Sequence, residues 1–187
     1  MDVERAREFL LALPHAVETM QWGDNLVFWV GDKAIGGKMF CLLNLDARAH
    51  GVISYAAGPE RYAELVERDG IVPAPYMARI FWVAVQRWGA LRNVEWEEEL
   101  SAAHAMTLAK LPKRVLDVLA MPERAQAKLI AERRKLLANR AEQKVAAKEK
   151  PGRRAKVARR DVPDGVGQSF GTAALGSGTK RGRKLRW

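Results

Sequence analysis

The sequence predicts an α+β domain over residues 1–120, with helices packed on an antiparallel sheet, then a basic helix over 121–150 and a disordered basic tail over 151–187. Three observations lead to this prediction. Short runs of β-forming residues follow one another at turn-length intervals, which is typical of antiparallel strands. Segments with apolar residues at three- and four-residue spacing flank these runs. Beyond Pro122 the apolar pattern fades, and basic residues accumulate.

The first helix is predicted over residues 2–13, where apolar side chains recur at helical spacing. Asp2 is a suitable N-cap, because its carboxylate can accept a backbone hydrogen bond of the first turn. Pro14 ends the helix. The strand-like segments that follow are residues 26–30, 38–45 and 52–56, with turns at 22–25 and 31–33.

A second helix is predicted to begin near Pro59, since proline is favoured at the first helical position. Gly70 is a good C-terminal stop for this helix. The remaining segments are an extended stretch at 72–75, a strand at 76–85, a helix from Glu95 or Trp96 to about Lys110, and a short helix at 114–119.

The tryptophans and the one cysteine are expected to serve the core. Trp22, Trp29, Trp82 and Trp88 are predicted to pack inside the domain rather than to stack on bases. Cys41 lies in an apolar strand and is predicted to be a small buried side chain rather than a reactive thiol. A single cysteine also excludes a disulfide framework and any zinc site built from several cysteines.

A set of phrases in a fixed order along the first 118 residues resembles the MmcQ/YjbR family. These phrases are residues 22–23, 27–33, 38–40, 59–65, 75–76, 82–85 and 108–113. The resemblance implies a compact α+β domain with a CyaY-like fold, as in the frataxin-like CyaY proteins. It also implies a predicted DNA-binding role.

Charge is distributed very unevenly along the chain. The whole sequence carries 32 Lys and Arg against 22 Asp and Glu, a net charge of +10. Residues 1–120 hold 13 basic and 16 acidic side chains, whereas residues 121–187 hold 19 basic and 6 acidic ones. The net charges are therefore −3 and +13. Such an asymmetry favours a polyanion as the partner of the C-terminal part.

The sequence therefore predicts a protein that binds nucleic acid with low specificity, with DNA favoured over RNA. Flexible cations neutralise phosphates without discriminating between bases. A contribution from the core is considered at Lys33, Lys38 and Arg79. The main predicted contacts are Arg133, Arg134 and Lys135 in the basic helix, and Arg153, Arg154, Lys156, Arg159, Arg160, Lys180, Arg181, Arg183, Lys184 and Arg186 in the tail.

The alternative hypothesis is a protein-interaction module with a solubilising tail. In that case the helix over 123–150 docks a protein partner or self-associates through Leu129, Ile130, Leu136 and Leu137.

Other function classes find no support in the sequence. No nucleophile–base phrase, metal-ligand spacing or phosphate-binding glycine loop is present, so no catalytic residue, metal or cofactor is predicted, and the protein is expected to be non-enzymatic. The absence of a long apolar run and of a signal-peptide pattern predicts a cytoplasmic protein without membrane association.

Overall fold

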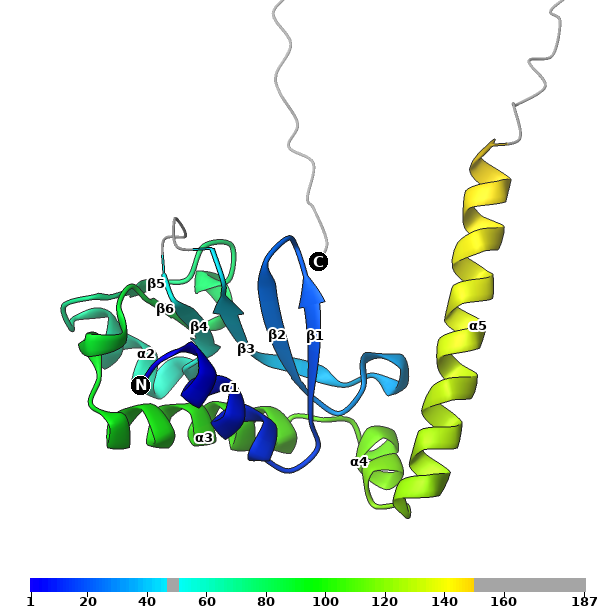
Figure 1. The fold of residues 1–187 in the computed structure, drawn as a ribbon, viewed down its shortest axis with the longest axis horizontal. Coiled ribbons are helices and arrows are strands. Elements are labelled where there is room, and N and C mark those ends of the chain that lie inside the picture. Colours follow the sequence, from blue (N-terminus) through cyan, green and yellow to red (C-terminus); the bar gives the residue numbers. More distant parts are fainter. Residues whose placement is uncertain (47–50, 150–187) are drawn as a thin grey trace, which may run out of the picture. The chain divides into compact units, whose positions relative to one another are not determined.

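The computed structural model describes residues 1–46 and 51–149 and has the predicted α+β architecture (Figure 1). One antiparallel sheet of six strands has the order β1-β2-β3-β4-β6-β5. The strands are β1 (Ala16–Gln21), β2 (Asn25–Val30), β3 (Lys38–Asn44), β4 (Ile53–Ala56), β5 (Ile71–Pro73) and β6 (Trp82–Val85).

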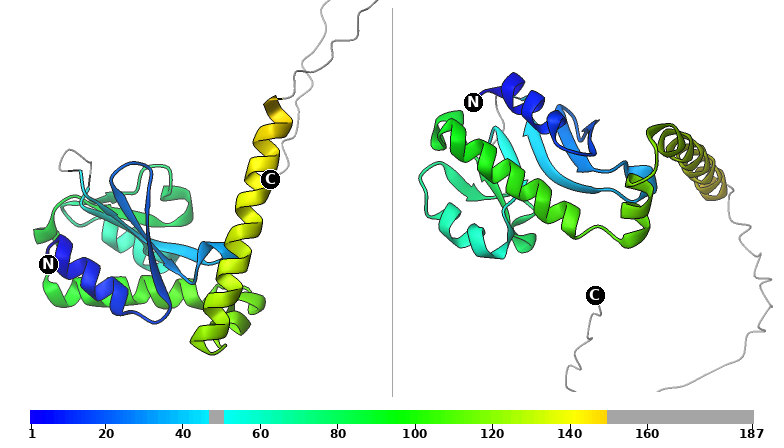
Figure 2. Two further views of the ribbon diagram at one scale, coloured as in Figure 1. Left: turned by 45° about the vertical axis from the view of Figure 1, so that its right-hand side comes forward. Right: turned by 90° about the horizontal axis from the view of Figure 1, so that it is seen from below.

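Three helices cover one face of this sheet. Side chains of α1 (Val3–Ala12), α2 (Gly58–Val66) and α3 (Asn93–Ala109) share one core with the strands. Figure 2 shows α1 and α3 on the same side of the sheet. The other elements are the helices α4 (Lys113–Leu119) and α5 (Glu123–Glu149) and the 3-10 turns η1 (Lys33–Ile35), η2 (Ala78–Ile80) and η3 (Trp88–Ala90).

Side-chain hydrogen bonds define where α1 and α3 begin. The carboxylate of Asp2 accepts a hydrogen bond of 2.8 Å from the backbone N–H of Arg5, so the predicted N-cap is confirmed. Helix α3 begins at Asn93, slightly before the predicted start. Its first turn is closed by Glu95, whose carboxylate accepts a 2.8 Å hydrogen bond from the backbone N–H of Arg92.

Glu95 is expected to make the stability of the fold decrease at acidic pH. Hydrogen bonds from the backbone of Arg92 and from the side chains of Arg68 and Arg92 lower the pKa of Glu95 to about 2. A depressed pKa contributes stability that is present above the unfolded-state value and is lost as the pH falls toward the folded-state value. We therefore expect Glu95→Gln to flatten the fall in thermal unfolding midpoint between about pH 5 and pH 2.

The matched control for this prediction is Glu98→Gln. Glu98 is exposed on the same turn of α3, so its removal should leave the acid profile of the parent protein unchanged. If the Glu95 and Glu98 variants lose stability equally steeply with acid, the hydrogen bonds of Glu95 do not carry the pH dependence.

The strand predicted over residues 76–85 is wrong at its start, since β6 begins only at Trp82. The preceding backbone turns at Tyr76 and Phe81, which have φ angles of 64° and 61°, and η2 lies between them. A left-handed backbone cannot continue a pleated strand. The aromatic side chains of this segment therefore mark a turn, although their β propensity favours a strand.

A bulge in the sheet places two consecutive β3 side chains in the core. Phe28 pairs with Cys41 whereas Trp29 pairs with Met39, so Phe40 is the extra residue. Phe40 and Cys41 are both fully buried. The prediction of a buried cysteine is confirmed, and burial raises the pKa of the Cys41 thiol, which disfavours the reactive thiolate.

One ion pair between α2 and α3 has a buried carboxylate. Glu99 is 7% exposed, and its carboxylate accepts hydrogen bonds from the guanidinium of Arg61. The hydroxyl of the buried Tyr55 approaches the same carboxylate at 3.4 Å. Burial raises the pKa of Tyr55, so its hydroxyl stays protonated and available to donate.

The basic helix predicted over 123–150 is present as α5, and it packs against η1. One carboxylate oxygen of Asp32 accepts a 2.7 Å hydrogen bond from the backbone N–H of Ala34, and the other accepts one from Arg134 of α5. Within the described residues, none of the helices combines the length and the apolar character that a membrane span needs.

Candidate functional site

A groove of about 310 Å³ lies where η1, α4 and α5 meet. We call it the cationic groove, because its charged lining residues are Lys33, Arg114 and Arg133. Leu129 and Leu137 supply part of its apolar wall. None of the three cations has an ion-pair partner among the residues that the structure describes. Their positive charge is therefore available to a ligand.

The cations around η1 are not equivalent. Arg134 is paired with Asp32, and this pair fastens α5 to η1. The ammonium of Lys33 lies 5.5 Å from the ring centroid of Trp29, within the range of a cation–π contact. Lys33 is thus held over the sheet while its charge stays exposed to solvent.

Of the residues predicted to contact nucleic acid, Lys33, Arg133 and Arg134 come together at this place. Lys135 is exposed on α5 but does not line the groove. Arg114 completes the cationic groove and was not predicted. Its sequence context gives no signal, because only the packing of α4 beside η1 brings it there.

Lys38 and Arg79, the other two candidates of the core, do not line the cationic groove. The ammonium of Lys38 donates a hydrogen bond of 2.7 Å to the backbone carbonyl of Lys110. Arg79 is exposed on η2, where it lines another groove with Tyr76.

The predicted contacts of the tail lie outside the described residues. They are Arg153, Arg154, Lys156, Arg159, Arg160, Lys180, Arg181, Arg183, Lys184 and Arg186.

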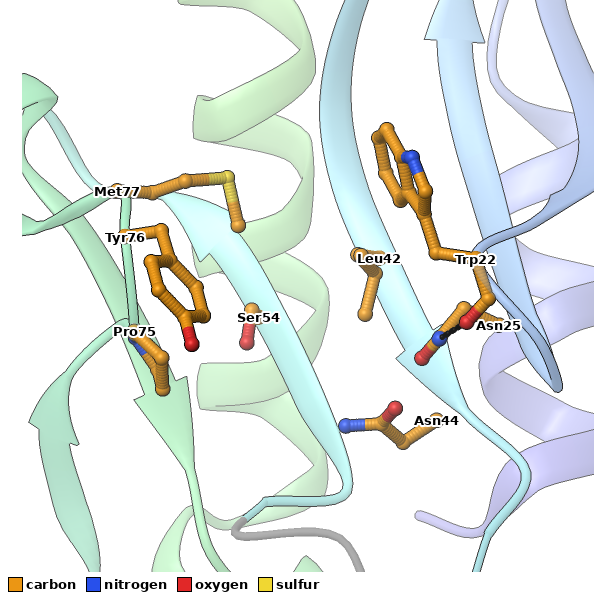
Figure 3. Close-up of a pocket in the computed structure, with 8 residues that line it drawn as sticks. All are labelled: Trp22, Asn25, Leu42, Asn44, Ser54, Pro75, Tyr76 and Met77. Atoms are coloured by element: carbon orange, nitrogen blue, oxygen red, sulfur yellow. Dashed lines mark hydrogen bonds between the residues drawn. The ribbon is translucent and has the colours of Figure 1, made fainter.

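A second groove, of about 540 Å³, lies on the sheet face opposite α1 and α3 (Figure 3). We call it the aromatic groove. Trp22 stands on one side of it and Tyr76 on the other, with Leu42 and Ser54 between them. The other lining residues are Asn25, Asn44, Pro75 and Met77.

The packing predicted for the tryptophans is wrong for Trp22, which is 65% exposed. Trp82 is buried as predicted, and Trp29 and Trp88 are half-buried. Trp22 escapes the core because it lies in the turn between β1 and β2, where its φ angle is 53°. It therefore does not follow the alternation of the strands.

The backbone at Tyr76 also has an unfavourable conformation for its residue type. The N–H of Met77 donates a 3.1 Å hydrogen bond to the carbonyl of Ala74, closing a turn with Pro75 and Tyr76 at its centre. Proline followed by a positive φ angle describes a type II turn, whose second central position favours glycine. A bulky residue there costs about 1 kcal/mol. The turn nevertheless holds a fully exposed tyrosine.

Polar groups converge on the otherwise apolar aromatic groove. The amide nitrogen of Asn25 donates a hydrogen bond of 2.7 Å to the carbonyl of Trp22. The amide nitrogen of Asn44 donates one of 2.8 Å to the carbonyl of Gly51. Both amide groups are thereby fixed in orientation, and their carbonyl oxygens are left to accept further hydrogen bonds. The side chain of Ser54 lies across the groove from them, nearer Tyr76.

The described residues contain no group of three or more His, Cys, Asp and Glu side chains placed to hold a metal ion. His104 is buried, and its ring nitrogen donates a hydrogen bond of 2.8 Å to the carbonyl of Pro14. Its ring also packs edge-on against Phe40. These contacts explain His104 as a core residue.

Comparison with known proteins identifies relatives of the domain. The family model described as YjbR matches residues 11–106, about half of the chain. The crystal structure of the Deinococcus radiodurans protein DR2400, described as a DUF419 domain, is similar with a TM-score of 0.55 and 25% sequence identity. That similarity covers 64% of this chain and 88% of the other. No curated protein matches the chain.

Proposed function

The chain belongs to the YjbR family, and we propose that it binds nucleic acid with low sequence specificity, mainly through the cations of residues 121–187. DNA is favoured over RNA because the family resemblance of the sequence implies a DNA-binding role. The proposed role is binding without catalysis, in the cytoplasm.

The observation that supports this proposal best is the separation of charge. Residues 121–187 carry 19 basic and 6 acidic side chains, whereas residues 1–120 carry 13 and 16. Cations concentrated in this way release condensed counterions when they neutralise phosphates, which favours binding without base contacts. The net charge of the preceding domain, −3, contributes no attraction to a polyanion.

The cationic groove gives this proposal a site within the described residues. Lys33, Arg114 and Arg133 lack ion-pair partners there, so a phosphate can approach them without displacing a carboxylate. The groove opens beside α5, whose C-terminal end leads into the tail sequence.

The contribution of the groove is tested by combining Lys33→Gln, Arg114→Gln and Arg133→Gln in the full chain. We expect the affinity for a DNA oligonucleotide to fall about tenfold at low salt. The slope of log K against log salt should become less negative by up to about 2.7, or about 0.9 for each phosphate that is no longer neutralised. Fluorescence anisotropy across a salt series measures both quantities.

A control variant removes the same number of charges outside the groove. Arg5, Arg87 and Lys110 are exposed and line neither groove, so replacing all three by Gln changes the net charge equally. If both triple variants lose the same affinity, the domain contributes only its overall charge, and the groove is not a site.

A second candidate function is protein docking through α5. Leu136 and Val145 on this helix are each 57% exposed, which leaves apolar surface without a partner in the described residues. Of the four residues predicted to form the docking stripe, Leu129 and Leu137 line the cationic groove instead. The sedimentation coefficient of the full chain tests self-association, and a monomer at all concentrations would speak against a homotypic partner.

A further inference from the structure

We propose that the aromatic groove binds an unpaired nucleobase, so that the protein holds a single strand by its bases as well as by its phosphates. This inference rests on the proposed function. It adds a base-binding site on the sheet face that the helices do not cover. Three features of the groove support it: two exposed aromatic rings, fixed polar groups, and continuity with the cations at η1.

Both aromatic residues have a backbone conformation that is unfavourable for their residue type. Trp22 and Tyr76 both have positive φ angles, where glycine or asparagine is favoured. Both side chains are nevertheless large, planar and exposed on opposite sides of the groove (Figure 3). Strained residues held in place by their surroundings concentrate at ligand-binding sites. Each exposed aromatic ring provides a stacking surface that the planar ring of any base can use.

The groove between the rings suits a base better than a charged ligand. Its volume of about 540 Å³ is within the range of sites for small planar molecules. None of the described residues that line it is charged. The amides of Asn25 and Asn44 are oriented by bonds to the backbone, so their oxygens can accept hydrogen bonds from the edge of a base.

A row of contacts links this groove to the cations at η1 across one face of the sheet. Lys33 lies over the ring of Trp29, whose indole N–H donates a 2.8 Å hydrogen bond to the hydroxyl of Thr19. The side-chain amide of Gln21 donates a hydrogen bond of 2.9 Å to the same hydroxyl. Gln21 also pairs across β1 and β2 with Asn25 of the aromatic groove. A strand whose phosphates meet Lys33 can therefore place its bases along this face.

A cation also flanks the aromatic groove on the side of Tyr76. Arg79 is exposed on η2 and lines a neighbouring groove together with Tyr76 and Ala78. An exposed guanidinium next to a stacking ring suits a nucleotide, because the phosphate follows the base at short distance along the strand. This placement favours a nucleic-acid strand over an uncharged aromatic ligand.

The test compares two probes of equal length and charge on the full chain. One is a single strand of about 15 thymidines, and the other is an abasic phosphodiester strand of the same length. We expect the unmodified protein to bind the thymidine strand at least tenfold more tightly, because the loss of stacked bases typically costs that much affinity. Fluorescence anisotropy gives both dissociation constants without any substitution.

A variant then assigns the difference to the aromatic groove. Asparagine tolerates positive φ angles, so Trp22→Asn combined with Tyr76→Asn should keep the fold and a thermal midpoint no lower than that of the parent. The control is Phe81→Asn, which replaces another exposed aromatic residue at positive φ that packs on Tyr62 outside the groove. We expect only the double variant to lose the preference for the thymidine strand.

The outcomes separate this inference from the proposed function. If the unmodified protein binds both strands equally, or if the double variant weakens both strands equally, no base enters the groove, yet phosphate binding stands. If neither strand binds, the proposed function fails together with the inference. A preference for bases that the Phe81 variant retains and the double variant loses supports the base site.

Discussion

A chain that ends at Lys150 is expected to bind nucleic acid at least 100-fold more weakly than the full chain in about 50 mM salt. Residues 151–187 hold ten basic and two acidic side chains. If each of their two basic clusters engages about four phosphates, the tail supplies most of the counterion release. A gel-shift or anisotropy titration of the two chains measures the difference in affinity.

Chain length and charge need to be separated in this comparison. A full-length variant in which the ten Lys and Arg of residues 151–187 are replaced by Gln keeps the length and removes the cations. It should bind as weakly as the chain ending at Lys150. Equal affinity of all three proteins would mean that the tail has no role in binding, and the solubilising interpretation of the tail would gain support.

Replacing Arg61 by Ala is expected to lower the free energy of unfolding by about 2–3 kcal/mol. The substitution removes the guanidinium that donates hydrogen bonds to the buried Glu99 and leaves the hydroxyl of Tyr55 as the other neighbour, at 3.4 Å. A buried carboxylate without its partner costs about 3–5 kcal/mol. We expect the smaller loss of about 2–3 kcal/mol because the side chain of Arg61 is 46% exposed and solvent screens its charge. Urea denaturation measures the difference.

Two further variants make this prediction specific. Glu99→Leu in the Arg61→Ala background removes the unpaired charge and should recover much of the lost stability. Arg87→Ala breaks an exposed ion pair with Asp69 and should cost less than about 1 kcal/mol. If Arg61→Ala costs no more than Arg87→Ala, the core ion pair does not stabilise the fold as described.

The fold was largely predictable because its elements carry local signals. The N-cap at Asp2, the proline at the start of α2 and the helix-forming composition of α5 each act within a few residues. Strands β2, β3 and β4 follow from short β-forming runs separated by turns. The error at β6 arose where propensity and turn chemistry disagree, since Tyr76 occupies a turn position that glycine normally fills.

The candidate sites were less predictable because they depend on tertiary packing. Lys33 and Arg133 were both singled out, yet nothing in the sequence places them in one groove, and Arg114 joins them only through the position of α4. The aromatic groove was missed for a different reason. Composition favours a buried tryptophan, whereas the exposure of Trp22 depends on the conformation of a single turn.

The central claim is that binding is driven by phosphate neutralisation from the C-terminal cations, and the salt dependence of affinity tests it most directly. For the full chain, log K is expected to fall against log salt with a slope of roughly −7 from the tail alone, corresponding to about eight phosphates, and the cationic groove makes the slope steeper. The chain ending at Lys150 should give a much shallower slope. A full-chain slope near zero, or equal slopes for the two chains, would contradict the account.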